Sequence, residues 1–136
     1  DKLHSELKPT LVNGKLTEES LHIPYLTAVL RESHRLRNPA PIMPIRKLVR
    51  DRPVHGHMLP KDSVVMLDSY SVGWQQEHFD APVDDFVPER FSKDAIQARK
   101  GTRHQIVDHA FFNGPFSQGA RRCPGSRVAM LEGRAL

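Results

Sequence analysis

The clearest periodic pattern lies in the first third of the chain, where apolar side chains recur at helical spacing. Pro24 suits the first turn of a helix, and Asn38-Pro39 ends the pattern. The sequence therefore predicts an amphipathic helix over 24–37. Its apolar stripe comprises Tyr25, Leu26, Val29, Leu30, Ser33 and Leu36. A shorter helix is expected to start near Thr17, because a capping hydroxyl there precedes acidic residues.

Short β-prone pieces replace the helical pattern between 42 and 68. Turn residues separate these pieces, notably Gly56 and Pro60. Small antiparallel pairs are the arrangement that such a pattern predicts. The expected pieces are 45–49, 53–55 and 63–67.

The rest of the chain shows little periodicity until its last residues. Asp and Pro residues predict an irregular coil over 75–91, and the polar stretch 92–109 predicts a surface loop that could include a helical turn. After a turn at 113–115, a loop and the start of a final helix are expected over 116–136. The predicted fold class is mainly α with small antiparallel β sheets, an α+β arrangement.

Length, composition and charge narrow the class of protein. The 136 residues fit one domain, and a hydrophobic share of 38% without long apolar runs excludes a membrane bundle. Lys and Arg total 20 against 16 acidic residues, a modest excess that suggests an acidic partner at most. Cys123 is the only cysteine, so an internal disulfide is excluded. Because the chain starts at Asp1 and stops inside a predicted helix, we expect a piece of a longer protein.

The most informative stretch surrounds Cys123. Pro124 suits the first position of a helix, so the thiol is predicted at a helix N-terminus, where the dipole favours a thiolate. Arg121 and Arg122 add positive charge. The residues that would let a flat group approach are Phe116, Gly119 and Gly125. Such a set describes an axial ligand to a metal macrocycle with acidic side chains. Two other interpretations stay open at this point: a small buried apolar cysteine, or a redox-sensing or nucleophilic one.

Three motifs in order resemble the cytochrome P450 family, the haem–thiolate monooxygenases. Phe116-x-x-Gly119-x-Arg121-x-Cys123-x-Gly125 resembles the haem-binding signature of that family. Glu32-Ser33-His34-Arg35 resembles its E-x-x-R helix motif, and Pro88-Glu89-Arg90-Phe91 resembles its P-E-R-F element. The resemblance covers the chain from Leu16 onward. It implies the C-terminal part of the family's fold, truncated at both ends.

The resemblance also implies a cofactor and its ligands. Haem b (iron protoporphyrin IX) would be bound with Cys123 on the iron. Arg121 would pair with one haem propionate, and Arg46, on the strand after the first motif, with the second. A solvated strand residue is the alternative for Arg46.

A structural role is implied for the two other motifs. Glu32 and Arg35 would meet Arg90 in a buried network that holds the cysteine loop in place. Loss of one member of such a network costs about 3–5 kcal/mol, because a buried charge is stranded. A solvated surface pair is the alternative that spacing alone leaves open for Glu32 and Arg35.

The implied activity is insertion of one oxygen atom from O2 into a lipophilic substrate. Electrons would come from a flavoprotein reductase or a ferredoxin-type donor, for which Arg31, Arg122 and Arg127 are candidate docking residues; ordinary surface charge is the alternative. Membrane association through segments outside this chain is implied, in the endoplasmic reticulum or mitochondrion of a eukaryote. The oxygen-activating residues of the family would precede Asp1, so the fragment alone is expected to be inactive.

The sequence also leaves alternative functions and sites open. The chain could be a non-catalytic truncated form that serves as an interaction module, or part of a haem–thiolate isomerase or dehydratase that needs no O2. His55 and His57 could form half a zinc site on one strand face, but no second ligand pair follows. No nucleic-acid partner is expected, because the short basic run in the chain is more typical of a solvated loop than of a nucleic-acid-binding surface. That run consists of Arg99, Lys100 and Arg103.

Two residues depart from the family pattern. Ser117 stands where glycine is common, which is tolerable if the position needs no positive φ. Trp74 occupies a position where a small basic or imidazole side chain is expected.

Overall fold

A computed structural model describes residues 2–39, 45–68, 70–112 and 114–135. It is mainly helical with two small antiparallel sheets, which confirms the predicted fold class. Residues 42–44, 113 and 136, which the predicted segments include, lie outside the described residues. The α-helices are α1 (Lys2–Leu7), α2 (Glu18–Leu21), α3 (Pro24–Leu36), α4 (Lys93–Arg99) and α5 (Ser126–Ala135). The 3-10 helices are η1 (Lys8–Thr10), η2 (Ser71–Trp74), η3 (Gln76–His78), η4 (Pro88–Phe91), η5 (Arg103–Asp108) and η6 (Gly119–Arg121).

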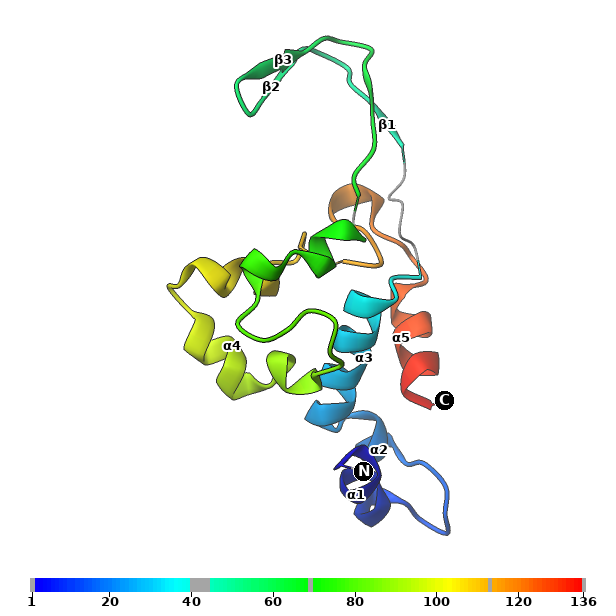
Figure 1. Ribbon diagram of the computed structural model, residues 1–136. Helices are drawn as coiled ribbons and strands as arrows, with labels where there is room; N and C mark the ends of the chain where they lie inside the picture. Colours follow the sequence, from blue (N-terminus) through cyan, green and yellow to red (C-terminus); the bar gives the residue numbers. More distant parts are fainter. Residues whose placement is uncertain (1, 40–44, 69, 113, 136) are drawn as a thin grey trace.

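The long helix α3 runs through the helical body, with α5 beside it (Figure 1). Pro24 occupies its first turn, and the helix ends where the Arg37 amide donates to the Ser33 carbonyl at 2.8 Å. A Cβ built on Gly133 of α5 would lie 3.6 Å from Cδ2 of Leu30, so the two helices pack closely there. The residues fully or nearly buried on α3 are Leu26, Ala28, Glu32 and Arg35.

The N-terminal helices are joined by a capping arrangement that the sequence predicted. The Thr17 side chain accepts from the Ser20 amide at 3.3 Å, and the Ser20 hydroxyl accepts from the Thr17 amide at 3.0 Å. Ser20 is fully buried and also receives a hydrogen bond from the Thr10 hydroxyl at 2.8 Å. This hydrogen bond connects η1 to α2.

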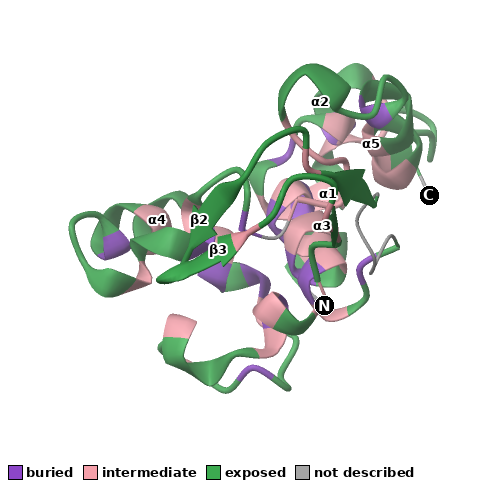
Figure 2. Cartoon of the chain, turned by 90° about the horizontal axis from the view of Figure 1, so that it is seen from above, coloured by how far each residue is buried: buried purple, intermediate pink, exposed green. Residues whose placement is uncertain are grey.

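The hydrophobic core is small, and charged side chains share the interior with it. Four apolar residues form one buried cluster, Phe79, Val83, Val107 and Phe112. The largest fully buried side chains are instead Arg35, Glu32 and Ser20. The buried residues lie in the helical body, whereas the strands are exposed or half-buried (Figure 2). The interior therefore depends on polar contacts as well as on apolar packing.

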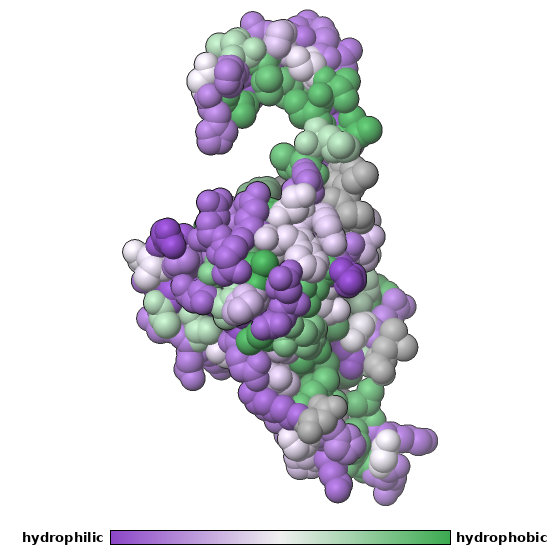
Figure 3. All heavy atoms as spheres, viewed as in Figure 1, coloured by the Kyte–Doolittle hydropathy of each residue, from purple (hydrophilic) through white to green (hydrophobic). Residues whose placement is uncertain are grey.

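Residues 45–68 form a ribbon that projects from the helical body, and we call it the β arm (Figure 1). In it β1 (Arg46–Lys47) pairs with β4 (Val64–Val65), and β2 (Arg52–Val54) pairs with β3 (His57–Leu59), both antiparallel. Apolar surface lies exposed along the arm (Figure 3). The exposed apolar residues of the arm are Ile45, Val49, Val54, Met58, Val64, Met66 and Leu67.

The segment 75–109 is more helical than the sequence predicted. Short 3-10 turns replace pure coil in 75–91, and the P-E-R-F element is itself the turn η4. The expected surface loop 92–109 contains α4 and η5. The Ser92 side chain caps α4 by accepting from the Ala95 amide at 3.2 Å. A helix this short leaves no stripe long enough to detect by periodicity.

Candidate functional site

Glu32, Arg35 and Arg90 meet in the interior, although Arg90 lies far from the other two in sequence. Arg35 forks onto the Glu32 carboxylate, with Nε to Oε2 and Nη2 to Oε1 both at 2.8 Å. Arg90 Nε reaches Oε1 of Glu32 at 3.3 Å. The Glu32 and Arg35 side chains are 0% exposed and that of Arg90 is 5% exposed. The solvated-pair alternative is therefore wrong, because all three charges are removed from water.

Backbone groups satisfy the rest of this network. The Val87 amide donates to Oε1 of Glu32 at 2.9 Å. Arg35 donates to the Gly73 carbonyl at 2.9 Å and to the Asp85 carbonyl at 3.1 Å. Arg90 donates to the carbonyls of Ala81 and Pro82. The network thus ties α3 to the whole irregular segment from 73 to 90 and leaves few buried donors unpaired.

Two further features fit this segment to the arginines. Both guanidinium groups lie over the Phe79 ring, with Cζ at 5.2 Å for Arg35 and 5.5 Å for Arg90 from the ring centroid. Gly73 approaches α3 so closely that a Cβ there would lie 2.9 Å from the Arg35 carbonyl oxygen. A larger residue at 73 would push η2 away from the network.

Cys123 sits on a loop that closes on itself. Its amide donates to the Phe116 carbonyl at 2.9 Å, and its carbonyl accepts from the Ser126 amide at 3.3 Å. The thiol is exposed, so the residues of this chain do not bury it as an apolar side chain. The prediction that Pro124 opens the helix is wrong: Pro124-Gly125 form a turn and α5 begins at Ser126. The cysteine therefore lies before a turn rather than directly before the first helical residue.

The loop requires left-handed backbone at two positions. Gly119 has a φ of +77° and Ser117 a φ of +58°. Serine at 117 thus occupies a conformation that glycine adopts at lower cost, contrary to the condition under which serine was expected to be tolerable. Gly125 has negative φ, and a Cβ there would lie at an ordinary contact distance of 3.8 Å from Sγ of Cys123.

Phe116 links the cysteine loop to α3. Its ring meets the His34 ring edge to face, with centroids 6.0 Å apart. Burial lowers the pKa of His34 from its ordinary value of 6.5. Both rings line a hollow of about 350 Å³ between α3, η5 and the loop, together with Arg31, Asp108 and Arg122.

The two arginines expected to bind propionates line one hollow. Arg46 of β1 and Arg121 of η6 border a space of about 430 Å³ that also has Leu67 and Phe111 in its wall. Both arginines are exposed, and within the described ranges neither has a carboxylate partner. Cys123 adjoins this hollow along the chain and is not part of its wall. The structure therefore brings Arg46 and Arg121 together, while their roles stay predictions.

A second charged cluster was missed by sequence reasoning. Arg99 is buried and binds both carboxylate oxygens of Asp108, at 2.8 and 3.1 Å, so its interpretation as part of a solvated loop is wrong. Arg31 lies 3.7 Å from the same carboxylate, with its guanidinium 4.2 Å from the Phe91 centroid. The spacing of Arg99 and Asp108 across two short helices gave no periodic signal.

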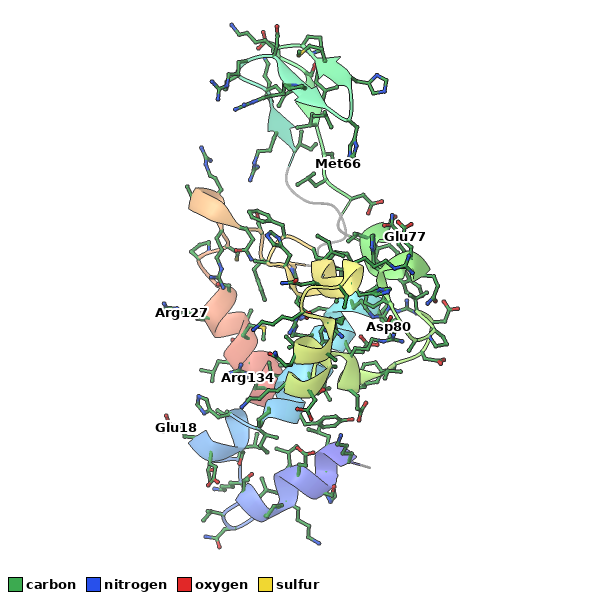
Figure 4. The ribbon with its side chains drawn as sticks, turned by 90° about the vertical axis from the view of Figure 1, so that its left-hand side faces the viewer. Glu18, Met66, Glu77, Asp80, Arg127 and Arg134 are labelled. Atoms are coloured by element: carbon green, nitrogen blue, oxygen red, sulfur yellow. The ribbon has the colours of Figure 1, made fainter. Side chains whose placement is uncertain are left out.

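Basic side chains gather beside the cysteine loop. Arg122, Arg127 and Arg134 line a hollow of about 350 Å³ along α5, with Arg127 and Arg134 visible on that helix in Figure 4. Arg31, the third expected docking residue, borders a different hollow together with Arg122. The expected set of Arg31, Arg122 and Arg127 is thus divided between two neighbouring hollows that share Arg122.

Other expectations concern metals and membranes. His55 lies in the turn between β2 and β3, with a φ of +46°. The prediction that it shares a strand face with His57 is therefore wrong. Within 2–39, 45–68, 70–112 and 114–135, no three His, Cys, Asp or Glu residues gather as metal ligands. No helix in these same ranges is long and apolar enough to cross a bilayer.

Known proteins are similar to this chain along nearly its whole length. The family model described as Cytochrome P450 matches residues 1–136. A ferruginol synthase of Salvia pomifera is 35% identical over 94% of the chain and 27% of its own length. Sugiol synthase of Salvia miltiorrhiza is 35% identical over 94% of the chain and 24% of its own length. Cytochrome P450 71B31 of Arabidopsis thaliana is 35% identical over 95% of the chain and 25% of its own length.

The chain spans about a quarter of the length of these relatives. Both the buried Glu32–Arg35–Arg90 network and the cysteine loop lie inside the matched region, which extends over residues 1–136. The motif resemblance is thereby confirmed by comparison over the whole chain: this protein belongs to the cytochrome P450 family.

Proposed function

We propose that this chain forms the cysteine-ligand side of a haem–thiolate monooxygenase, with Cys123 as the axial ligand of the iron. The observation that carries the proposal is an exposed thiol on a loop held by a backbone hydrogen bond of 2.9 Å to Phe116. A free thiol held in one place beside cations suits a metal ligand better than a core residue.

The residues present fit haem b. Its two carboxylates need cations, and Arg46 and Arg121 line one hollow without carboxylate partners among the described residues. Its flat apolar ring needs apolar contacts, which Leu67 and Phe111 offer in the same wall. When bound, the haem supplies O–O bond cleavage favoured by thiolate donation, and hence oxygen insertion into a lipophilic substrate.

The residues of this chain would act by binding and by holding position. Cys123 would hold the iron through its sulfur. Arg46 and Arg121 would bind the carboxylates and so orient the ring. Glu32, with its two arginines, keeps α3 against the segment that ends in η4. None of these roles includes the activation of oxygen.

We also propose an acidic electron donor for the basic hollow on α5. Arg122, Arg127 and Arg134 line it, and no Asp or Glu belongs to its wall. Complementary charge chiefly raises the rate of encounter, and this gain falls as salt increases. Electron transfer from a flavoprotein reductase or a ferredoxin-type donor should therefore slow with ionic strength. Membrane association of the whole protein belongs to the same proposal and concerns segments other than these.

The test is Cys123→Ser in the full-length protein. We expect the variant to lose the red-shifted Soret band of the reduced CO complex, because an alcohol does not supply thiolate donation. Far-UV circular dichroism shows whether the variant is folded, and Glu132→Gln on the exposed side of α5 serves as the control that keeps the band. An unchanged band in the serine variant removes Cys123 as the ligand.

A further inference from the structure

Asp108 lies between two arginines that come from different elements. Arg99, the last residue of α4, binds it through Nη2 at 2.8 Å and Nε at 3.1 Å. Arg31 of α3 approaches to 3.7 Å. The carboxylate is 15% exposed and the Arg99 side chain 10% exposed, so water competes little for this contact. One acidic residue at the end of η5 therefore joins three elements.

The cluster lies directly beside the buried Glu32 network. Arg31 precedes Glu32 on α3, and its guanidinium lies 4.2 Å from the centroid of Phe91, which follows Arg90. Burial lowers the pKa of Arg31, and the charge of Asp108 opposes that shift. The same two elements, α3 and η4, are thus clamped twice, and the second clamp adds α4 and η5.

Asp108 is also where the chain turns toward the cysteine loop. Val107 on one side and Phe112 on the other are buried in the core cluster. The Phe112 amide donates to the His109 carbonyl at 2.9 Å. Gly114 lies so close to this turn that a Cβ there would be 2.9 Å from the Ala110 carbonyl oxygen. Residues 109–112 are therefore held by the core cluster, by their own turn and by the close approach of Gly114.

The cluster and the cysteine loop face the same space. Arg31 and Asp108 line the hollow of about 350 Å³ that Phe116 and Arg122 of the loop also line. Phe116 is the residue whose carbonyl accepts from the Cys123 amide. A shift of η5 would therefore change the hollow beside the residue whose backbone holds the thiol.

We propose that Asp108, held by Arg99 and Arg31, is a positioning residue for Cys123. It fixes the start of the segment that leads to the loop, so that the Cys123 side chain would be held in position for the iron. This inference rests on the proposed function, because it requires Cys123 to be the ligand. A brace with a purely structural role would lower the stability of the fold and leave ligation in the folded protein unchanged.

The experiment compares Asp108→Asn and Asp108→Glu in the full-length haem protein. The readout is the ratio of thiolate-ligated to thiol-ligated reduced CO complex, measured where circular dichroism shows every variant folded. We expect the ratio to fall about tenfold in the asparagine variant, equivalent to about 1.4 kcal/mol. The glutamate variant should recover most of the loss, because it restores the charge. Asp62→Asn, which removes an exposed carboxylate paired with Lys47 at 3.0 Å, should leave the ratio unchanged.

Each outcome decides one claim. A wild-type ratio in folded Asp108→Asn overturns the inference, as does an equal fall in Asp62→Asn. If Asp108→Asn does not fold, Arg31→Gln takes its place, since that side chain is 36% exposed and tolerates change better; a wild-type ratio there overturns the inference equally. A wild-type protein that forms no thiolate-ligated complex contradicts the proposed function instead, which separates the two failures.

Discussion

Replacing Glu32 by alanine tests the energetics of the buried network most directly. The carboxylate accepts four hydrogen bonds, two from Arg35, one from Arg90 and one from the Val87 amide. Without it, two guanidinium groups at 0% and 5% exposure keep their charge and lose their counter-ion. Removing one partner of a buried ion pair costs about 3–5 kcal/mol, because the remaining charge cannot regain water.

That loss is large beside the total stability of a small domain, about 5–15 kcal/mol. Urea unfolding followed by circular dichroism measures it as a lower midpoint at unchanged slope. The matched control is Asp62→Asn, which breaks the Lys47–Asp62 contact of 3.0 Å between side chains that are 65% and 60% exposed. Exposed pairs contribute about 0–1 kcal/mol, so the control should barely move the midpoint.

The reasoning is refuted if Glu32→Ala costs no more than Asp62→Asn. A double replacement sharpens the test, because Glu32→Leu combined with Arg35→Met removes both charges of the closest pair. Apolar substitution of a whole buried pair is often close to neutral, so the double variant should be more stable than Glu32→Ala. Arg90 loses its counter-ion in both variants, so a double variant as unstable as the single one would assign the cost to Arg90 or to packing rather than to the stranded charge of Arg35.

Two further predictions follow from the backbone and from a titratable ring. Ser117→Gly should raise the free energy of unfolding by about 0.5–1 kcal/mol, because it relieves a left-handed backbone at φ +58°. Gly119→Ala, whose Cβ would meet nothing within 4 Å at φ +77°, should lower it by a similar amount, and equal urea midpoints for all three proteins would contradict the strain argument. For His34, the lowered pKa means that below pH 6.5 the unfolded chain takes up a proton that the folded protein resists, so stability falls as pH drops through that value toward the folded pKa. His34→Gln should flatten this part of the stability–pH curve, and an unchanged curve would assign the acid sensitivity to other groups.

The sequence predicted those elements whose signals are local. Pro24 and the apolar stripe behind it predict α3 to within a residue of its end, and turn residues such as Gly56 predict antiparallel pairs between 42 and 68. Strand β3 (His57–Leu59) was not among the expected β pieces. Helix α4 was missed because its seven residues span too few turns to show a stripe. The positive φ of Ser117 could not be predicted either, because serine, unlike glycine, is not typical of a left-handed backbone.

The candidate site likewise contains some contacts that the sequence predicted and others that it did not. Motif resemblance predicted that Glu32, Arg35 and Arg90 would meet, although spacing alone favoured a surface pair for the first two. Nothing local marks Asp108 as the partner of Arg99, because that contact depends on how two short helices are folded together. Contacts of this kind are set by tertiary packing, and a single sequence carries no periodic trace of them.

The charged interior has a thermal consequence. Exposing apolar surface on unfolding raises the heat capacity by about 0.45 cal/mol/K per Å², whereas exposing polar surface lowers it by about 0.26. In the described ranges the largest fully buried side chains are Arg35, Glu32 and Ser20 rather than hydrocarbon. The heat-capacity increment per residue should therefore lie below the usual range, which makes the curve of stability against temperature unusually flat. Warming also lowers the free-energy penalty for desolvating the ion pair. This interior should therefore keep more of its stabilising effect at high temperature than an apolar interior of equal size.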